Sequence, residues 1–305
     1  MAAPLIAIVG PTASGKCALA LRLARDRDGE IVSCDSQQVY RGLDIGTAKA
    51  SPDEQREVPH HLIDVVDPDE VFSAAEYARR ARVVLAGITS RGRLPLVAGG
   101  TGLYLRALTE GLFDGPARDD ATRRRLETLA HRHGDARLHR LLGHLDPEAA
   151  ARIPPRDRVR TIRALEVYRA TGRSISAQHR EGAEPLRGYR ILTLGLDPDR
   201  SRLRQVVEGR TRAMLEKGLL DEVRGLLAKG YGPDLRPLQA IGYREAVAVV
   251  RGEMTSDEAQ AAIVTATMRF AKRQMTWFRH QAEVTWFTDP AAAAAAARAW
   301  LGALT

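Results

Sequence analysis

The sequence has few cysteines and no long apolar run, and we expect no leader segment. Two of its 305 residues are cysteine, which excludes a disulfide framework and a four-cysteine zinc site and favours a reducing compartment. No apolar stretch is long enough to span a bilayer, and the first expected strand follows Met1-Ala2-Ala3-Pro4 directly, without a signal peptide. We therefore expect a cytoplasmic protein that has no membrane partner.

Positive charge is in excess. The chain has 46 Lys and Arg residues against 38 Asp and Glu, for a net charge of +8. This balance favours a polyanionic partner, although a merely soluble basic protein would have the same charge. The length of 305 residues admits one large domain or two smaller ones.

The first motif is the glycine loop of residues 10–16. It follows the apolar run of residues 5–9 and precedes the helical pattern of residues 18–23. This order of strand, loop and helix predicts a phosphate site of the ATP-binding P-loop type. Loop amides, the helix N-terminus and Lys16 would all direct positive charge at an anion. An ordinary strand-to-helix corner with a surface lysine is the alternative interpretation.

Cys17 stands where such loops usually carry a Ser or Thr that binds magnesium. Magnesium prefers hard oxygen ligands, so a thiol is a poor candidate metal ligand. The loop can still hold a diphosphate through its amides. We therefore expect Mg²⁺ to depend on oxygen atoms other than those of residue 17.

Two further polar segments follow expected strands. Residues 34–38 come after the strand expected over 30–33, and residues 99–102 come after the buried strand expected over 94–98. The carboxyl ends of strands in an open α/β sheet are where ligands bind. We expect both segments to face the same edge as the glycine loop. Thr101 would offer its hydroxyl there, cap the next helix, or do both.

Residues 115–187 differ in character from the rest, with little strand signal and many arginines. They predict a helical, basic insertion that divides an α/β core into residues 1–114 and 188–305. Within a helix expected from about residue 156, Arg156, Arg160 and Arg163 would share one face. Glu166 is the one acid available to Arg163 there, so we expect excess positive charge; a solvated face with salt bridges is the alternative.

A long basic helix is expected between Thr255 and His280. Its basic residues alternate with aromatic ones, which suits a nucleic-acid groove. We expect Phe270 and Trp277 to lie in the core.

The loop indicates a diphosphate or triphosphate without specifying a nucleotide. Proteins that hydrolyse nucleoside triphosphates usually add a strand ending in Asp, whereas the strand over 94–98 ends in glycine. Asp35 is the well-placed acid, either as a metal ligand or as a general base. Together with the basic insertion, these features indicate group transfer from a diphosphate to a large anionic acceptor.

The chain resembles the bacterial tRNA dimethylallyltransferase (tRNA isopentenyltransferase) family from the phosphate loop almost to the C-terminus. The motifs that carry the resemblance lie at residues 10–16, 35–40, 44–49, 61–68, 99–104, 163–168, 171–172, 241–243 and 271–277. The resemblance implies a P-loop kinase-like α/β core with a parallel sheet and an inserted all-helical domain that grips the tRNA anticodon stem-loop. It also implies transfer of a dimethylallyl group from dimethylallyl diphosphate to the exocyclic N6 of the adenosine 3′ of the anticodon. Diphosphate is released with Mg²⁺ present, and we expect a monomer.

Residue by residue, the resemblance implies these roles. Asp35 matches the base toward the adenine amine, and Thr101 matches a hydroxyl near the reacting atoms. The implied diphosphate site consists of Gly10, Pro11, Thr12, Ala13, Ser14, Gly15, Lys16 and Cys17, with Arg163 also in reach. The implied tRNA contacts are Asp35, Ser36, Gln37, Gln38, Thr101, Arg123, Val159, Arg160, Thr161, Ile162 and Arg163. Two residues depart from the family pattern, since Cys17 replaces Thr and Val159 replaces a usual Gln.

Three other functions remain open. An adenylate isopentenyltransferase would use the same donor with a free nucleotide as acceptor, but it needs neither the basic insertion nor the long basic helix. A small-molecule kinase would use ATP at the same loop, and the missing acidic strand end argues against it. A non-catalytic RNA-binding P-loop protein would bind tRNA without regard to dimethylallyl diphosphate.

Overall fold

The chain forms two compact units. A computed structural model describes every residue except 1, 114, 117, 183 and 305. One unit comprises Met1–Thr109 and Leu186–Thr305, and the other comprises Glu110–Pro185. The sequence placed these boundaries at 114/115 and 187/188, and residue 114 lies outside the described residues.

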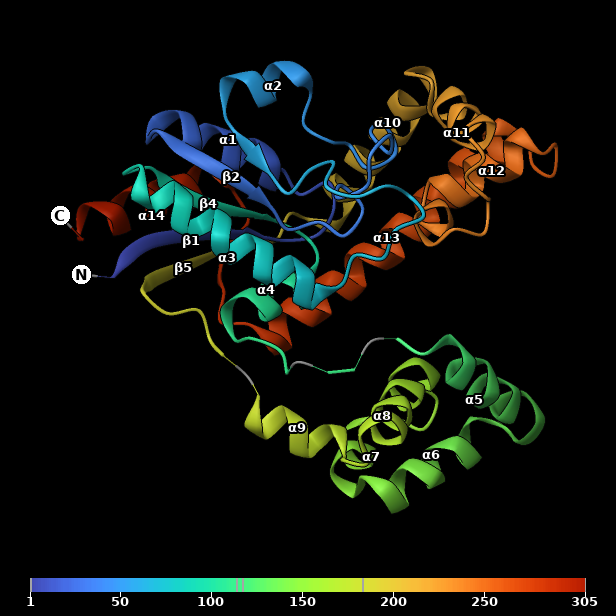
Figure 1. Ribbon diagram of the computed structural model, residues 1–305. Coiled ribbons are helices and arrows are strands. Elements are labelled where there is room, and N and C mark those ends of the chain that lie inside the picture. Colours follow the sequence, from blue (N-terminus) through green and yellow to red (C-terminus); the bar gives the residue numbers. More distant parts are fainter. Residues whose placement is uncertain (1, 114, 117, 183, 305) are drawn as a thin grey trace. The chain divides into compact units, whose positions relative to one another are not determined.

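The first unit is built around a six-stranded parallel sheet (Figure 1). Its strands are β1 (Ala3–Val9), β2 (Gly29–Ser33), β3 (His60–His61), β4 (Leu94–Gly99), β5 (Tyr189–Leu196) and β6 (Thr285–Phe287). Their order is β3-β2-β4-β1-β5-β6, and the neighbouring strands pair in parallel. All carboxyl ends therefore meet at one edge, which confirms the expected α/β fold class.

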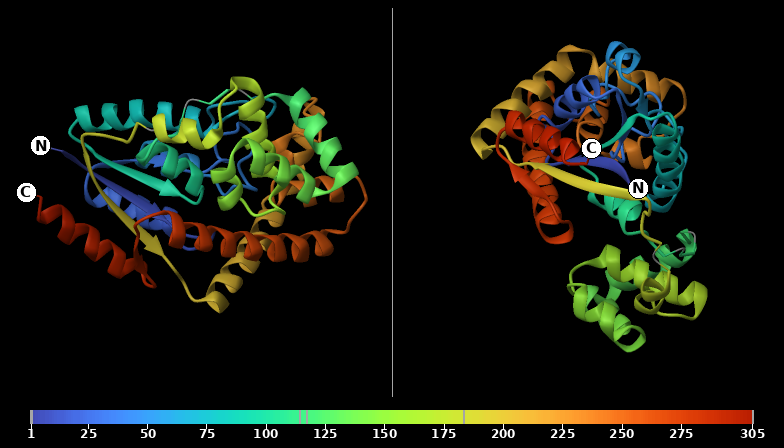
Figure 2. Two further views of the ribbon diagram at one scale, coloured as in Figure 1. Left: turned by 90° about the horizontal axis from the view of Figure 1, so that it is seen from below. Right: turned by 90° about the vertical axis from the view of Figure 1, so that its left-hand side faces the viewer.

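Helices cover both faces of this sheet (Figure 2). They are α1 (Lys16–Asp26), α2 (Pro52–Glu57), α3 (Ala74–Ser90), α4 (Gly102–Thr109), α10 (Arg200–Glu216), α11 (Leu219–Ala228), α12 (Tyr243–Val250), α13 (Ser256–Gln281) and α14 (Pro290–Gly302), with a 3₁₀ turn at Arg236–Gln239. In β1, Ile6 and Ile8 pack with α1 and α14, whereas Leu5 and Val9 pack with the helices of the other face. Burial on both faces explains why β1 is a continuous apolar run.

Two short elements lie between α11 and α13. Residues 236–239 form a 3₁₀ turn, and α12 starts at Tyr243. Gly242 separates the two, because its φ of 95° is a left-handed backbone conformation that favours glycine. The motif of residues 241–243 is therefore a turn that enters a helix, and it lines the cavity described below.

The second unit is helical throughout its described residues. It contains α5 (Asp120–His133), α6 (Asp135–Leu145), α7 (Pro147–Arg152), α8 (Arg158–Thr171) and α9 (Ile175–Glu181). Leu138, Leu142 and Leu165 form its core. Asp157 caps α8, since its side chain accepts a hydrogen bond from the amide of Arg160. Arg156 thus precedes the helix, and the expectation that it shares a helical face with Arg160 and Arg163 is wrong.

In the described part of the chain, helices that combine enough length with enough apolar character to cross a membrane are absent.

Candidate active site

The glycine loop joins β1 to α1 at the carboxyl edge of the sheet. Gly15, the residue before α1, has a φ of 89°. Gly10 has a φ of 145°, and a Cβ atom there would lie 2.7 Å from the carbonyl oxygen of Leu196. Both positions therefore need glycine. The loop directs the first amides of α1, which lack an acceptor within the helix, toward the space beyond the sheet.

Lys16 is buried in this loop. Its Nζ donates to the carbonyl oxygen of Pro11 at 3.1 Å. Burial lowers the pKa of Lys16, against opposing contributions from Cys17 and Asp35. The nearby Ser14 hydroxyl is also buried and has no hydrogen-bond partner among the described residues. Buried cations and orphaned hydroxyls are unfavourable alone, so both groups favour an anionic ligand.

Arg210 of α10 is a second cation at the loop, which the sequence pattern did not predict. Its Nη1 donates to the Thr12 hydroxyl at 3.2 Å. Burial lowers the pKa of Arg210, with Cys17 and Asp35 opposing the shift. Arg210 is one of several arginines spaced along α10, and only its contact with the loop distinguishes it from the others.

Asp35 and Thr101 follow neighbouring strands, and hydrogen bonds join their segments. The Thr101 amide donates to the carbonyl oxygen of Cys34 at 3.1 Å. The Thr101 hydroxyl accepts from the Ser36 amide at 3.0 Å, so it joins the two loops rather than capping α4. The Asp35 carboxylate accepts from the Gln37 amide at 2.8 Å. Among the described residues it forms no ion pair, which leaves it available as a base.

The two glutamines of this segment differ in their surroundings. Gln38 is buried; its oxygen accepts from the Ser33 hydroxyl at 2.9 Å, and its amide lies within hydrogen-bond distance of the carbonyl oxygens of Thr47 and Ala48. Its side chain therefore holds two segments of this unit together. The side-chain oxygen of Gln37 is buried and, in the described part of the chain, has no donor. Gln37 can accept a hydrogen bond from a ligand.

One carboxylate fixes the loop that faces Asp35. Glu222 of α11 accepts from the amides of Asp44 and Ile45 at 3.0 and 2.8 Å, and from the Tyr243 hydroxyl at 2.6 Å. Tyr243 leaves no room for a side chain at Gly46, where a Cβ atom would lie 2.5 Å from the ring. The loop is therefore positioned by contacts that a family motif at 44–49 does not reveal by itself.

These segments enclose a cavity of about 610 Å³. Its polar residues include Lys16, Asp35, Ser36, Gln37, Thr101, Arg210, Arg273 and Gln274, and its apolar residues include Val206, Val207, Met214, Ile241, Ile263 and Phe270. Phe270 is 37% exposed, with the Arg273 guanidinium 5.6 Å from its ring centroid. The expectation of a core position is therefore wrong for Phe270, whereas Trp277 packs against the core.

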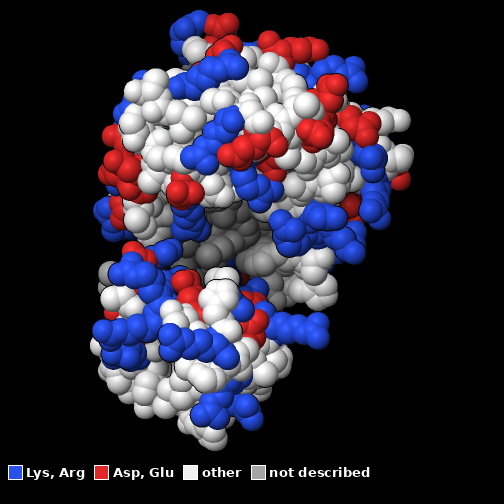
Figure 3. All heavy atoms as spheres, turned by 90° about the vertical axis from the view of Figure 1, so that its right-hand side faces the viewer, with Lys and Arg blue, Asp and Glu red and all other residues white. Residues whose placement is uncertain are grey.

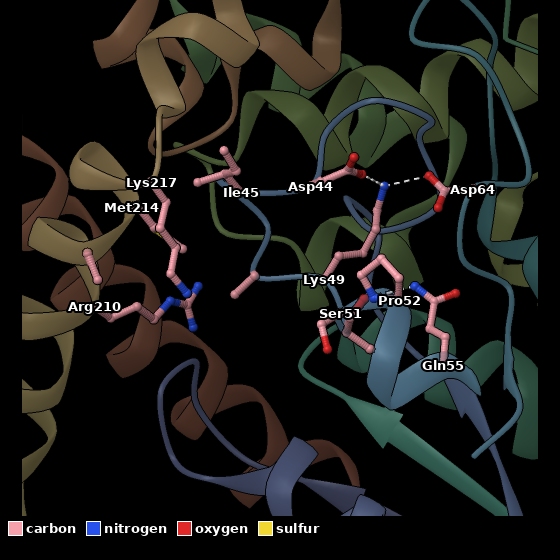
Figure 4. A pocket seen from close by; sticks show the side chains of 13 residues that line it. Asp44, Ile45, Lys49, Ser51, Pro52, Gln55, Asp64, Arg210, Met214 and Lys217 are labelled. Atoms are coloured by element: carbon pink, nitrogen blue, oxygen red, sulfur yellow. Dashed lines mark hydrogen bonds and ion pairs between the residues drawn. The ribbon is translucent and has the colours of Figure 1, made fainter. Parts of the chain in front are cut away.

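A second cavity of about 410 Å³ shares Ala48, Arg210 and Met214 with the first. Figure 4 shows Lys49 between Asp44 and Asp64, across from Arg210 and Lys217. Lys49 also donates to the carbonyl oxygen of Tyr40 at 2.8 Å. Its three donors are thus occupied, and Lys49 supports the wall of this cavity.

In the helical unit, the residues that the sequence singled out have three kinds of environment. Val159 is 73% exposed and Arg160 is also exposed, whereas Thr161 and Ile162 are buried. Arg123 and Arg163 both donate to Glu166, whose side chain is fully buried. Burial pushes the pKa of Glu166 upward, but the hydrogen bonds from Arg123 and Arg163 outweigh it, and the net pKa is lowered.

The sequence and the fold match known proteins over almost the whole chain. A family model described as IPP transferase matches residues 38–281. A tRNA dimethylallyltransferase of Syntrophus aciditrophicus is 52% identical over 283 residues, covering 93% of this chain and 91% of the relative. The crystal structure of a tRNA isopentenylpyrophosphate transferase from Bacillus halodurans is 42% identical, with a TM-score of 0.67 over 93% of this chain and 89% of that one.

A eukaryotic dimethylallyltransferase captured acting on tRNA is more distant in sequence, at 27% identity. It has a TM-score of 0.75 and covers 94% of this chain and 74% of its own. These likenesses confirm the resemblance and the P-loop kinase-like fold expected from the motifs. The chain therefore belongs to the IPP transferase family, the family of the tRNA dimethylallyltransferases.

Proposed function

We propose that this chain transfers a dimethylallyl group from dimethylallyl diphosphate to the exocyclic N6 of the adenosine 3′ of the anticodon in tRNA, releasing diphosphate. One observation carries the proposal: the buried Lys16, the half-buried Arg210 and the carboxylate of Asp35 line a single cavity that also has an apolar wall. The cations Lys16 and Arg210 suit a diphosphate. Asp35 suits an amine that must lose a proton, and the apolar wall suits a five-carbon group.

The chemistry follows from these groups. The bond between the allylic carbon and the diphosphate oxygen breaks, and N6 of the adenine forms a bond to that carbon. Lys16, Arg210 and the first amides of α1 stabilise the charge that develops on the leaving diphosphate. The proton lost from N6 passes to the Asp35 carboxylate.

Two neutral groups complete this arrangement. The buried oxygen of Gln37 accepts from the other hydrogen of the adenine amine, since it has no other donor in the described part of the chain. The Thr101 hydroxyl accepts from the Ser36 amide at 3.0 Å and donates to the Ser36 hydroxyl at a long 3.4 Å; when the donor is bound, its hydrogen would turn to an oxygen of the donor. Both groups orient substrates rather than exchange protons, which is a positioning contribution.

Mg²⁺ fits this site only as a companion of the diphosphate. Clusters of three or more His, Cys, Asp or Glu side chains suited to a metal ion are absent from the described residues. Mg²⁺ commonly keeps several waters and binds through one or two protein oxygens together with substrate phosphates. We propose the buried Ser14 hydroxyl as the protein's oxygen ligand, and not Cys17, since the Asp35 carboxylate is needed as the base. Bound there, Mg²⁺ would neutralise part of the leaving-group charge.

The positive charge of the surface favours a large, polyanionic acceptor. Arg269, Lys272 and Arg273 are exposed along α13, and Figure 3 shows basic side chains gathered on one face of the helical unit. A protein that neutralises several phosphates gains affinity through counterion release, which a mononucleotide does not need. We therefore favour the anticodon stem-loop of tRNA over free adenylate as acceptor.

The helical unit's individual residues receive more specific roles in this proposal. Val159 and Arg160 are exposed and available to tRNA, whereas Thr161 and Ile162 act through the fold of α8. Because Arg163 is paired with Glu166, we assign the diphosphate contact to Arg210 instead. We further propose a monomer that acts in the cytoplasm.

An acceptor assay with labelled dimethylallyl diphosphate tests this proposal. The acceptors are an unmodified anticodon stem-loop, the same stem-loop without the target adenine, and AMP. We expect label in the first alone. Label in AMP would favour the adenylate isopentenyltransferase, and transfer of phosphate from ATP in place of prenyl transfer would favour a kinase. Binding of tRNA without any transfer would favour a non-catalytic protein.

A further inference from the structure

Gln274 of α13 connects the two glycine turns of the site. Its side-chain oxygen accepts from the Thr12 amide at 2.9 Å, and its side-chain nitrogen donates to the carbonyl oxygen of Gly100 at 2.8 Å. The side chain is 7% exposed and lines the cavity. Thr12 belongs to the phosphate loop, and Gly100 immediately precedes Thr101. A single amide group therefore spans the gap between the donor-binding loop and the turn that carries the hydroxyl.

The chemistry of the two partners requires an amide at this position. Thr12 presents an N–H donor, and Gly100 presents a carbonyl acceptor. Among the common side chains, an amide combines a fixed acceptor and a fixed donor at opposite corners of a planar group. A carboxylate would meet the Gly100 carbonyl with a second acceptor, and an apolar side chain would leave both backbone groups without partners.

The glycine opposite is fitted to this amide. A Cβ atom at Gly100 would lie 2.2 Å from the Gln274 nitrogen, so a larger residue would force the two apart. Thr12 is held from its other side by Arg210, which donates to the Thr12 hydroxyl at 3.2 Å. Backbone amide and side-chain hydroxyl of Thr12 are thus fixed by α13 and α10 respectively.

We propose that Gln274 is a positioning residue that sets the spacing between the phosphate loop and the Thr101 turn. This inference rests on the proposed function, because that spacing matters if the diphosphate leaves from one loop while Thr101 orients the donor from the other. The amide of Thr12 is occupied by Gln274, so it supports the loop rather than binding phosphate. A misplacement of about 1 Å in a reacting group can reduce a rate by about 10²-fold.

The first test is Gln274→Met, which preserves the length of the side chain and removes both hydrogen bonds. We expect kcat for prenyl transfer to the stem-loop to fall about 10- to 100-fold, as loss of alignment would cause. The dissociation constants of inorganic diphosphate and of the stem-loop, measured by calorimetry, should change less than about 3-fold, since the binding groups themselves remain. Gln260→Met is the matched control, because Gln260 is a half-buried glutamine on the same helix and is not among the described residues that line the cavity.

The second test is Gln274→Glu, measured across pH. An ionised carboxylate can accept from the Thr12 amide but has no hydrogen for Gly100, whereas the protonated form has both an acceptor and a donor. We expect the ratio of variant to wild-type kcat to rise as pH falls from about 8.5 to about 6, because a buried carboxyl facing a carbonyl has a raised pKa. Lys16, Asp35, Arg210 and Arg273 line the same cavity, and the wild-type measurement at each pH cancels their titration.

Retained binding, reduced kcat and a ratio that recovers at low pH would together support the inference. A kcat for Gln274→Met within about 2-fold of wild type would overturn it. So would equal losses of binding and kcat, or a ratio for Gln274→Glu that does not change with pH, since a side chain that only stabilises the fold would behave in that way. If wild-type protein itself fails to transfer the prenyl group, the proposed function has failed instead.

Discussion

Buried and half-buried cations are held in opposite ways in the two units. In the helical unit, Arg123 and Arg163 both donate to the fully buried carboxylate of Glu166. In the α/β unit, Lys16 donates to a carbonyl oxygen and Arg210 donates to a hydroxyl. Ion pairs with an acid are absent for both of these in the described part of the chain. The first group is complete within the protein, whereas the second lacks an anion.

This difference separates structural charge from functional charge. A buried cation beside an acid forms a satisfied pair, and removing either partner leaves the other uncompensated. A buried cation beside neutral oxygens is less stable when charged, and the lowered pKa values of Lys16 and Arg210 reflect that burial. A bound diphosphate would remove this penalty. Lys16 and Arg210 of the α/β unit are therefore suited to bind an anionic ligand. Arg123 and Arg163 of the helical unit stabilise the fold.

The largest expected effect comes from replacing Asp35, which lies near Lys16 and Arg210 and forms no ion pair with either in the described part of the chain. Asp35→Ala should lower kcat by about 10²-fold or more, because general-base loss commonly has that effect. Affinity for the stem-loop should change much less, which steady-state kinetics and a filter-binding measurement can separate. Asp44→Ala is the control, since Asp44 pairs with Lys49. A near-normal kcat for Asp35→Ala would remove Asp35 from the role of base.

The contrast between the two units can be tested with one substitution made in each. Arg210→Met should weaken binding of inorganic diphosphate about 10- to 100-fold, since a hydrogen bond to a charged group contributes about 1.5–3 kcal/mol. Thermal stability should stay the same or rise, because a half-buried cation without an acid partner is removed. Calorimetry and a thermal unfolding curve provide the two readouts.

Arg123→Met should show the opposite pattern. Removing Arg123 takes its hydrogen bonds from the Glu166 carboxylate but leaves Arg163 paired with it. A hydrogen bond to a charged group contributes about 1.5–3 kcal/mol, and a loss of that size should appear as faster hydrogen exchange in α5 and α8. Affinity for diphosphate should be unchanged. If both variants lose diphosphate affinity equally, the division between structural and functional cations does not hold.

A smaller effect is expected from the pH dependence of the stability that ionised Glu166 gives the helical unit. Its pKa is lowered in the folded protein from an ordinary value of 4.5. Its stabilising contribution is therefore complete above that ordinary pKa and is lost as pH falls through the lowered one. Wild-type α8 should lose exchange protection progressively below about pH 4.5. Glu166→Gln should be less protected at neutral pH and should show less change over the acid range; identical profiles for the two proteins would contradict this account.

The sequence predicted the fold and the polar edge because both rest on local patterns. A strand, a glycine loop and a helix in that order define the phosphate site, and Asp35 and Thr101 directly follow strands that pair in parallel with their neighbours. Parallel pairing alone brings such segments to one edge. The resemblance to a family added the reaction, which no spacing of residues could have specified.

Long-range contacts account for what the sequence did not predict. Arg210 lies 198 residues from Thr12, and Gln274 lies 262 residues from it. The sequence around Phe270 is compatible with either a buried or an exposed side chain, and the packing of α13 determines which it is. The sequence suggested that Arg163 could bind an anion. In the structure Arg163 pairs with Glu166, and Arg123 from another helix pairs with the same carboxylate.

The smallest expected effect comes from replacing Cys17 in the phosphate loop. Cys17 is exposed at the start of α1, beside the buried Lys16, where the P-loop pattern calls for a Ser or Thr hydroxyl. Cys17→Thr would restore a hard oxygen ligand, so the Mg²⁺ concentration for half-maximal activity should fall a few-fold, because Mg²⁺ strongly prefers oxygen to sulfur. The activity at saturating Mg²⁺ should change little, since the unpaired cations Lys16 and Arg210 remain in place. An unchanged Mg²⁺ titration would mean that the diphosphate, water and the protein's other oxygens supply all the ligands that matter, and that residue 17 has no part in holding the metal.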